Sequence, residues 1–242
     1  MSKIAVIYYS ATGHVHKLAE ALATGASDAG ADVRLRRVAE LAPEKVIRHQ
    51  DAWHEHHEAT ADVVEKAKLE DLEWADGFAL GTPTRYGLPA AQLKEFIDQT
   101  GPLWAGGHLS NKVATSFTSS ANPHGGQEST LLALNNIFYH WGSLIVPPGY
   151  THEVLYAAGG NPYGTSYASG LEGDQAVSRE ALTAAHYQGH RLAQYASRLV
   201  ARTNDAADGR DRLPRSADPL SLDPYDPPHR VSFRWQAAHA SP

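Results

Sequence analysis

The sequence predicts an α/β fold in which a doubly wound, five-stranded parallel sheet carries helices on both faces. Short runs of apolar, β-branched and aromatic residues alternate with segments whose apolar residues recur every three or four positions. Such alternation is typical of strands and helices that follow one another along the chain. The first run, Ile4 to Tyr9, is apolar or aromatic throughout, which is typical of a strand buried on both faces.

Five strands and four helices can be placed in order. The strands are expected at Ile4 to Tyr9, Val33 to Val38, Gly77 to Gly81, Lys112 to Thr118 and Ser143 to Val146. Helical spacing of apolar residues marks the helices at Val15 to Ala23, Leu93 to Ile97, Leu131 to Phe138 and Leu182 to Leu199. Because crossovers between parallel strands are right-handed, every strand-to-helix loop should lie on one edge of the sheet, where ligands bind.

Three segments stand apart from this pattern. Residues 43–70 are charged and rich in His, with weak helical periodicity, and are expected to be an insertion packed on the surface. Residues 147–175 form a long predicted loop rich in Gly, Pro and Tyr. Residues 204–242 hold six of the fourteen prolines and show no periodicity, which indicates a disordered C-terminal tail. Residues 1–203 are therefore predicted to form a single domain.

Composition excludes several classes of function. The chain has 242 residues, a hydrophobic fraction of 42% and a net charge of −6, which argue for a globular protein that does not bind nucleic acid or anionic membranes. It contains no cysteine, so disulfides, thiolate nucleophiles and iron–sulfur clusters are excluded and any electrons must reside on an organic cofactor. Without a leader-like segment or a membrane-spanning apolar run, we expect a cytoplasmic location.

The loop after the first strand has the chemistry of a phosphate cradle. It comprises Ser10, Ala11, Thr12, Gly13, His14 and Val15. Backbone N–H groups at a helix N-terminus attract anions, hydroxyls add donors, and Gly13 permits close approach. The loop lacks the Lys of a nucleoside triphosphate loop and the three glycines of a dinucleotide fingerprint. A monophosphate without magnesium fits best, and FMN is the usual one. On its own, however, the same loop is equally a simple helix-capping turn.

Two further loops favour the flavin over the capping turn. Within residues 82–87, Pro83, Thr84, Arg85 and Tyr86 follow the third strand, and Ser119, Ser120, Ala121, Asn122 and Gly125 follow the fourth. Both loops are expected on the same sheet edge as the first. They offer hydroxyls, backbone donors and planar groups, which suit a flat isoalloxazine ring at the switch point of the sheet.

With these loops in place, the sequence resembles the WrbA-like NAD(P)H:quinone oxidoreductases, a branch of the flavodoxin-like superfamily. The resemblance extends from about Lys3 to Val200. It depends on the order and spacing of several blocks, which are IAVIYYSATGHV, GTPTRYG, DQTGPLWAGG, GGQE, HWG, PPGY, GGNPYG and YQG.

The resemblance implies a flavodoxin-like homotetramer that binds FMN and uses NADH or NADPH to reduce quinones by two electrons. It implies that the first loop wraps the FMN phosphate and that the other two contact the ring and ribityl chain. His140 of a neighbouring subunit would reach the flavin and donate a proton to the reduced quinone. Trp104 would line the pocket above the ring. Thr12, where the family often has an aromatic residue, would lie on the substrate side.

Two other functions remain open at the level of sequence. One is a one-electron carrier like a true flavodoxin. The other is a regulatory or binding module in which FMN is not catalytic. The histidines at 49, 54, 56 and 57 do not have the spacing of a zinc motif, so no metal site is expected. The physiological quinone and the preference between NADH and NADPH cannot be inferred from the sequence.

Overall fold

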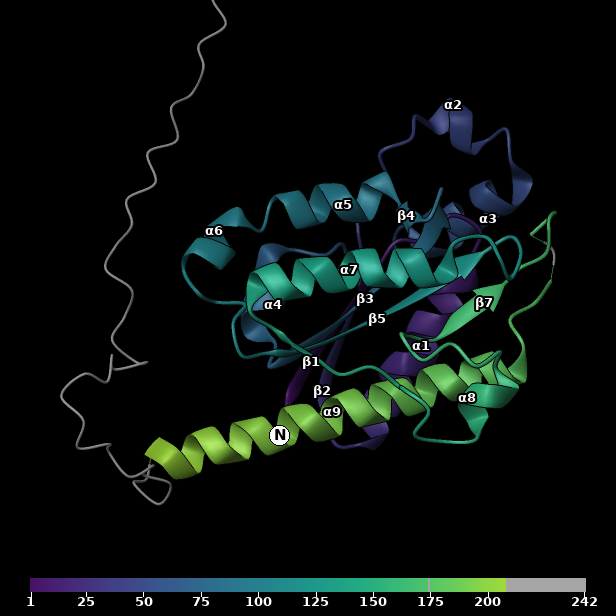
Figure 1. Cartoon of the computed structure of the whole chain (residues 1–242). Coiled ribbons are helices and arrows are strands. Elements are labelled where there is room, and N and C mark those ends of the chain that lie inside the picture. The colour runs from purple at the N-terminus through teal and green to yellow at the C-terminus, as the bar shows by residue number, and fades with distance from the viewer. Residues whose placement is uncertain (174, 208–242) are drawn as a thin grey trace, which may run out of the picture.

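A computed structural model describes residues 1–173 and 175–207 of the chain (Figure 1). Its central sheet has the strand order β2-β1-β3-β5-β6, and each neighbouring pair on this path is parallel. These strands are β1 (Lys3–Tyr8), β2 (Asp32–Arg37), β3 (Gly77–Arg85), β5 (Val113–Ser120) and β6 (Leu144–Ile145). The predicted doubly wound sheet is therefore confirmed.

The fifth position in the sheet is occupied by two short strands instead of one. The strand predicted at Ser143 to Val146 is only the two-residue β6, which pairs with the start of β5. β7 (Ser166–Ala168) pairs in parallel with the end of β5. The segment between them includes α8 (Val154–Ala157). The predicted loop 147–175 thus contains a strand, which the sequence does not reveal because Ser-Tyr-Ala is too short to form an apolar run.

The third strand also extends past its predicted end. β3 continues to Arg85 and turns back into β4 (Leu88–Pro89), which pairs with it antiparallel. The turn residues Tyr86 and Gly87 have φ angles of 54° and 77°, and positive φ at both central positions is the geometry of a tight hairpin. The predicted loop at residues 82–87 is therefore the rigid tip of a hairpin.

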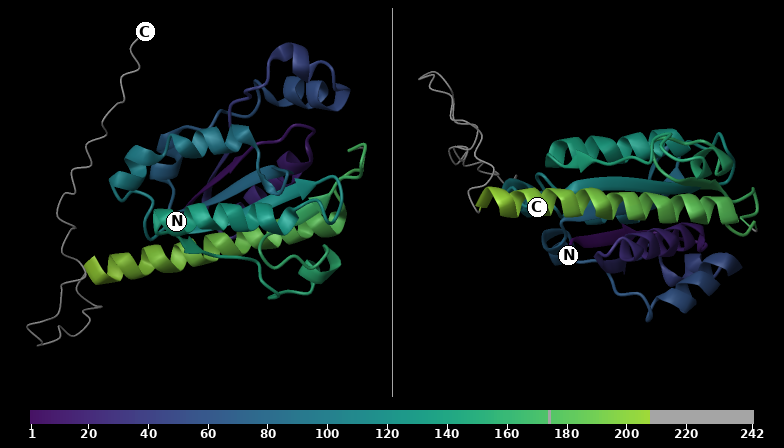
Figure 2. Two further views of the ribbon diagram at one scale, coloured as in Figure 1. Left: turned by 45° about the horizontal axis from the view of Figure 1, so that its top comes forward. Right: turned by 90° about the horizontal axis from the view of Figure 1, so that it is seen from below.

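Helices cover both faces of the sheet (Figure 2). One face packs against α1 (His14–Asp28) and the long α9 (Arg179–Ala207), around core residues such as Leu18 and Leu192. The other face packs against α4, α5, α6 and α7, around core residues such as Phe78 and Phe138. The bounds of these four helices are Leu69–Trp74, Ala91–Asp98, Gly101–Ala105 and Gln127–Trp141.

The segment 43–70 adds α2 (Glu44–Ile47) and α3 (Asp51–Thr60), which lie beside the carboxyl end of β2 (Figure 2). α9 continues to Ala207, past the predicted domain boundary at 203. The rest of the predicted tail lies outside the described residues. Within residues 1–173 and 175–207, no helix is long and apolar enough to cross a membrane.

Candidate functional site

A cavity of about 400 Å³ opens at the carboxyl edge of the sheet, within the size range of small-molecule sites. Segments after β1, β3, β5 and β7 surround it. Its lining residues are Ser10, Ala11, Thr12, His14, Val15, Gln50, Pro83, Thr84, Arg85, Tyr86, Ser119, Ser120, Ala121, Asn122, Gly125, Ser169, Gly170, Leu171, Glu172 and Gly173. The three loops singled out in the sequence therefore meet in one place.

The loop from Ser10 to Val15 leaves the N-terminus of α1 open to an anion. Gly13 precedes the helix with a φ of 95°, and its N–H donates to Ser10 Oγ at 3.1 Å. Among the residues that the structure describes, no side chain caps α1. The first-turn N–H groups therefore keep their attraction for negative charge, as in known phosphate-binding helix N-termini.

His14 contributes to this cradle through its backbone, because its ring is held elsewhere. His14 Nε2 lies 2.9 Å from the Gln175 carbonyl oxygen, so it carries the proton and donates. Nδ1 is then free to accept from Thr12 Oγ1 at 3.1 Å. The ring also stacks on Tyr167 with a centroid distance of 6.1 Å. These contacts fix the loop against the segment that follows β7.

The hairpin tip between β3 and β4 is held by Thr84. Its Oγ1 accepts from the Gly87 N–H at 3.1 Å and from Thr130 Oγ1 at 2.7 Å. The Thr84 side chain thus joins the hairpin to α7 and is not free for a ligand. The Arg85 guanidinium donates to the Thr84 carbonyl at 3.0 Å, and the Tyr86 side chain is fully exposed beside the cavity. These two planar groups are the ones available for contact with a flat ring.

The loop after β5 is stiffened by a buried polar network. Gln127 Nε2 donates to Ser120 Oγ at 2.8 Å, and Ser120 Oγ donates to the Asn122 carbonyl at 2.6 Å. Ser166 Oγ in turn donates to Gln127 Oε1 at 2.7 Å. Because the polar side chains are used internally, this loop presents mainly backbone groups to the cavity.

Two parts of the cavity wall are absent from the sequence-based prediction. Residues 169–173 follow β7 and are tied to the β5 loop, since the Ser169 N–H donates to the Ser120 carbonyl at 2.8 Å. Gln50, just before α3, forms another part of the wall. The glycines at 170 and 173, with φ angles of 83° and 68°, are the signal for a tight loop here. Their place at the ligand edge depends on β7, which the sequence conceals.

His140 and Trp104 do not line the cavity of their own chain. His140 lies exposed in the last turn of α7, whose first turn is the end near the cavity. Trp104 Nε1 donates to the His140 carbonyl at 2.8 Å, so the two residues form one surface patch. The expectation that Trp104 lines the pocket is not met within a single chain, because α6 packs at the opposite end of α7.

The donor set of the cavity suits a phosphate joined to a planar ring. The open helix N-terminus and Gly13 are suited to an anion, and the loops that line the rest of the cavity with backbone groups are suited to a planar ring. A larger hollow of about 800 Å³ lies between the 43–70 segment and β2. Its described lining has charged side chains of both signs, and the helices that begin beside it, α2 and α4, are only four and six residues long. Across the described part of the chain, no group of three or more acidic or His side chains is arranged to hold a metal.

The chain belongs to the NADPH-dependent FMN reductase family, whose model matches residues 2–153. More particularly, it is similar to proteins named NAD(P)H dehydrogenase (quinone). It is 45% identical over 181 residues to that of Deinococcus radiodurans, covering 73% of this chain and 90% of the relative. It is 43% identical over 204 residues to that of a Chelativorans species, covering 83% of this chain and all of the relative.

Solved structures agree with the fold. The flavodoxin, WrbA-like protein from Agrobacterium tumefaciens superposes with a TM-score of 0.56 at 26% identity, over 82% of this chain and 99% of that one. A flavodoxin from the domain Archaea gives 0.52 at 16% identity, over 81% and 99% of the two chains. The flavodoxin-like fold and the predicted WrbA-like relationship are both confirmed.

Proposed function

We propose that this protein is an NAD(P)H dehydrogenase (quinone) that holds FMN in the cavity at the carboxyl edge of the sheet. The observation that carries the proposal is the uncapped N-terminus of α1, which opens into a cavity walled by the segments after β3, β5 and β7 and by Gln50. The family of FMN reductases and the relatives named for quinone reduction support the same chemistry.

Each segment has a distinct part in this proposal. Residues 10–15 hold the phosphate through backbone N–H groups, and the loops after β5 and β7 border the ring with backbone donors. Arg85, Tyr86 and Thr12, which all line the cavity, would contact the nicotinamide nucleotide and the quinone as each binds in turn. Bound FMN supplies a ring that accepts a hydride and returns two electrons to the quinone. The protein orients these partners and excludes water.

We propose further that the protein is a homotetramer in which His140 of a neighbouring subunit completes the site. Trp104, which donates to the His140 carbonyl, is an exposed apolar side chain, and so are Tyr139 and Leu144, which lie close to His140 in the sequence. Exposed apolar patches of this kind favour subunit contact. His140 would act as a general acid that donates a proton to the reduced quinone oxygen. A cytoplasmic location fits the soluble nucleotide donor.

The role of His140 is tested by a His140→Ala variant in three assays. We expect FMN binding and reduction by NADH to persist, while benzoquinone reduction slows by about 10²-fold or more, the usual contribution of a positioned acid. Light scattering must show the same oligomer as the native protein. Unchanged quinone turnover in an intact oligomer would remove His140 from the mechanism.

A further inference from the structure

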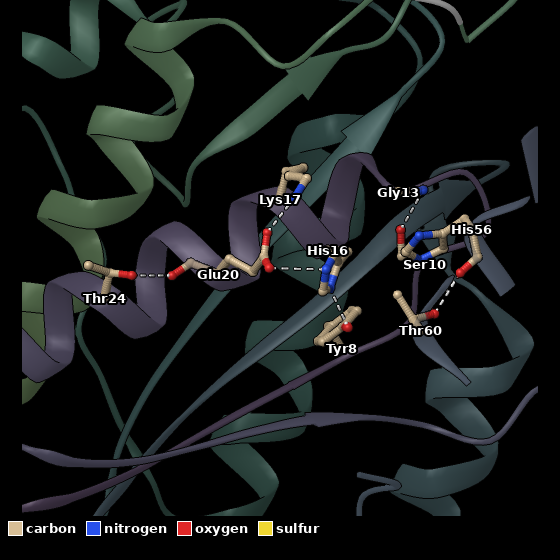
Figure 3. A network of polar contacts seen from close by, with 9 residues as sticks. All are labelled: Tyr8, Ser10, Gly13, His16, Lys17, Glu20, Thr24, His56 and Thr60. Carbon is tan, nitrogen blue, oxygen red and sulfur yellow. Dashed lines mark hydrogen bonds and ion pairs between the residues drawn. The ribbon is translucent and has the colours of Figure 1, made fainter. Parts of the chain in front are cut away.

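His56, from the 43–70 segment, lies directly behind the phosphate loop (Figure 3). Its Nδ1 is 3.5 Å from the point where a side-chain carbon on Gly13 would stand. Its ring centroid is 5.3 Å from that of His16. A second cavity of about 360 Å³ adjoins this spot, and His14 and Lys17 share its wall with both rings. Groups that can carry positive charge thus gather on the far side of an anion cradle.

The ring of His16 is held in place by two partners. Tyr8 Oη lies 2.5 Å from His16 Nδ1, and His16 Nε2 lies 3.3 Å from Glu20 Oε1 (Figure 3). Burial, followed by the charge of Glu20, raises the pKa of the Tyr8 phenol, so the phenol keeps its proton and donates it to Nδ1. Protonation of His16 would require this bond to reverse, with Nδ1 donating to Tyr8 Oη. Burial also lowers the pKa of His16 despite Glu20.

His56 differs from His16 because its ring is free to change its protonation state. No other described residue forms a hydrogen bond with either ring nitrogen of His56, whose backbone carbonyl accepts from Thr60 Oγ1 at 2.7 Å. Burial, then the charges of His16, His57, Lys17 and His14, lower the pKa of His56 to about 4. With no anion in the loop, the ring is therefore neutral at neutral pH.

The carboxylates near His56 are already engaged. Glu20 pairs with Lys17 at 2.8 Å, and Glu40 accepts from Tyr9 Oη at 2.8 Å. The charged and titratable groups that face His56 from α1, α3, β1, β2 and the segments that follow β1 and β2 are His14, His16, Lys17, Glu20, His57, Tyr8, Tyr9, Arg36, Arg37, Glu40 and Glu65. An anion in the adjacent loop would therefore be the strongest new influence on this ring.

We propose that His56 is a positioning residue for the FMN phosphate and takes up a proton when that phosphate binds. This inference rests on the proposed function, since it assumes FMN in the loop from Ser10 to Val15. The two binding events are linked. If bound FMN raises the affinity of His56 for a proton by some factor, protonated His56 raises the affinity of the protein for FMN by the same factor. The 43–70 segment, which lies outside the main sheet, thereby becomes part of the cofactor site.

The expected effect depends on pH. An opposite charge within about 4–6 Å changes a protonation equilibrium by about 10- to 1000-fold, and we take about 100-fold for a phosphate in the loop beside His56. Since the free ring titrates at about pH 4, this value strengthens FMN binding about tenfold at pH 5 and leaves it unchanged at pH 8. The FMN phosphate also titrates, but it does so equally for every variant, so its effect cancels in the ratio of the FMN affinities of the native and variant proteins.

The experiment titrates the apoprotein with FMN at pH 5 and pH 8 and follows the quenching of flavin fluorescence. Native protein is compared with His56→Gln and with His54→Gln, the same substitution two residues earlier in α3. We expect His56→Gln to weaken FMN binding about tenfold at pH 5 and not at pH 8, and His54→Gln to change neither. Riboflavin, which lacks the phosphate, should bind the His56→Gln variant as it binds the native protein.

The outcomes separate this inference from the proposed function. Equal FMN affinities of native protein and His56→Gln at both pH values overturn the role of His56 and leave the function standing. An equal loss for riboflavin and FMN also overturns it, because it indicates a structural role. If FMN binds none of the proteins, the proposed function itself fails. Circular dichroism checks folding at both pH values, and His56→Phe, which fills the ring's space, replaces a Gln variant that does not fold.

Discussion

Replacing Gly13 by alanine should distort the backbone of the loop from Ser10 to Val15 without causing a steric clash. Gly13 has a φ of 95°, and an added Cβ would meet only His56, at 3.5 Å, an ordinary contact distance. The cost is therefore conformational, about 1–2 kcal/mol for an L-residue in this region. If the loop relieves that strain by rotating, the N–H groups at the start of α1 turn away from the phosphate. Losing one charge-assisted hydrogen bond, worth about 1.5–3 kcal/mol, would weaken FMN binding by about 10- to 150-fold.

Gly30 offers a matched control at the other end of α1. It has a φ of 83°, and nothing lies within 4 Å of an added Cβ. Gly30→Ala should therefore lose about as much stability, 1–2 kcal/mol, and none of the FMN affinity. The assay combines urea denaturation of both apoproteins with FMN titration by fluorescence. Equal FMN affinities for the two variants would refute the assignment of residues 10–15 to the phosphate.

Three further predictions concern stability and the cavity wall. Gly25→Ala should cost about 3 kcal/mol or more in thermal unfolding, because its Cβ would stand 1.9 Å from the His186 carbonyl oxygen between α1 and α9; a stable variant would contradict this packing. Ser120→Ala should cost about 1–3 kcal/mol and weaken FMN binding, because it leaves the buried Gln127 amide without its acceptor; an unchanged urea midpoint would oppose this. Burial disfavours ionised Glu40, but hydrogen bonds from two backbone amides and two side chains outweigh it and lower its pKa below 4.5. Ionised Glu40 therefore contributes fully to stability above pH 4.5, and this contribution is lost as the pH falls through the lowered pKa. Glu40→Gln should make stability fall less steeply with decreasing pH than in the native protein. Stability–pH curves of the same slope for the two proteins would contradict the role of these hydrogen bonds.

The parts of the fold that follow periodic patterns are predictable from sequence. An uninterrupted apolar run reveals β1, a short apolar run reveals the start of β3, and three-to-four spacing of apolar residues reveals α1 and α7. β7 and α8 could not be predicted, because their few residues form no periodic pattern and owe their structure to pairing with β5 and packing on α9. β4 was hidden for the same reason, since a two-residue strand depends on its hairpin turn.

The candidate site was predictable where a loop follows a recognisable strand. The residues after β1, β3 and β5 all reach the cavity, because parallel strands deliver their carboxyl ends to one edge. The wall at residues 169–173 was missed along with β7. Gln50 was missed because only the folded chain brings the start of α3 beside the first loop. The roles of His140 and Trp104 depend on a neighbouring subunit and remain predictions.

The most direct test of the account is an anaerobic titration of FMN-loaded protein with NADH or NADPH, followed by benzoquinone. The visible absorbance of the oxidised flavin should disappear with one nucleotide consumed per FMN and return with one quinone reduced. Such stoichiometric two-electron exchange is what the proposed function predicts. If FMN binds in the cavity but neither nucleotide reduces it, the protein is a carrier or a binding module, and the central claim is wrong.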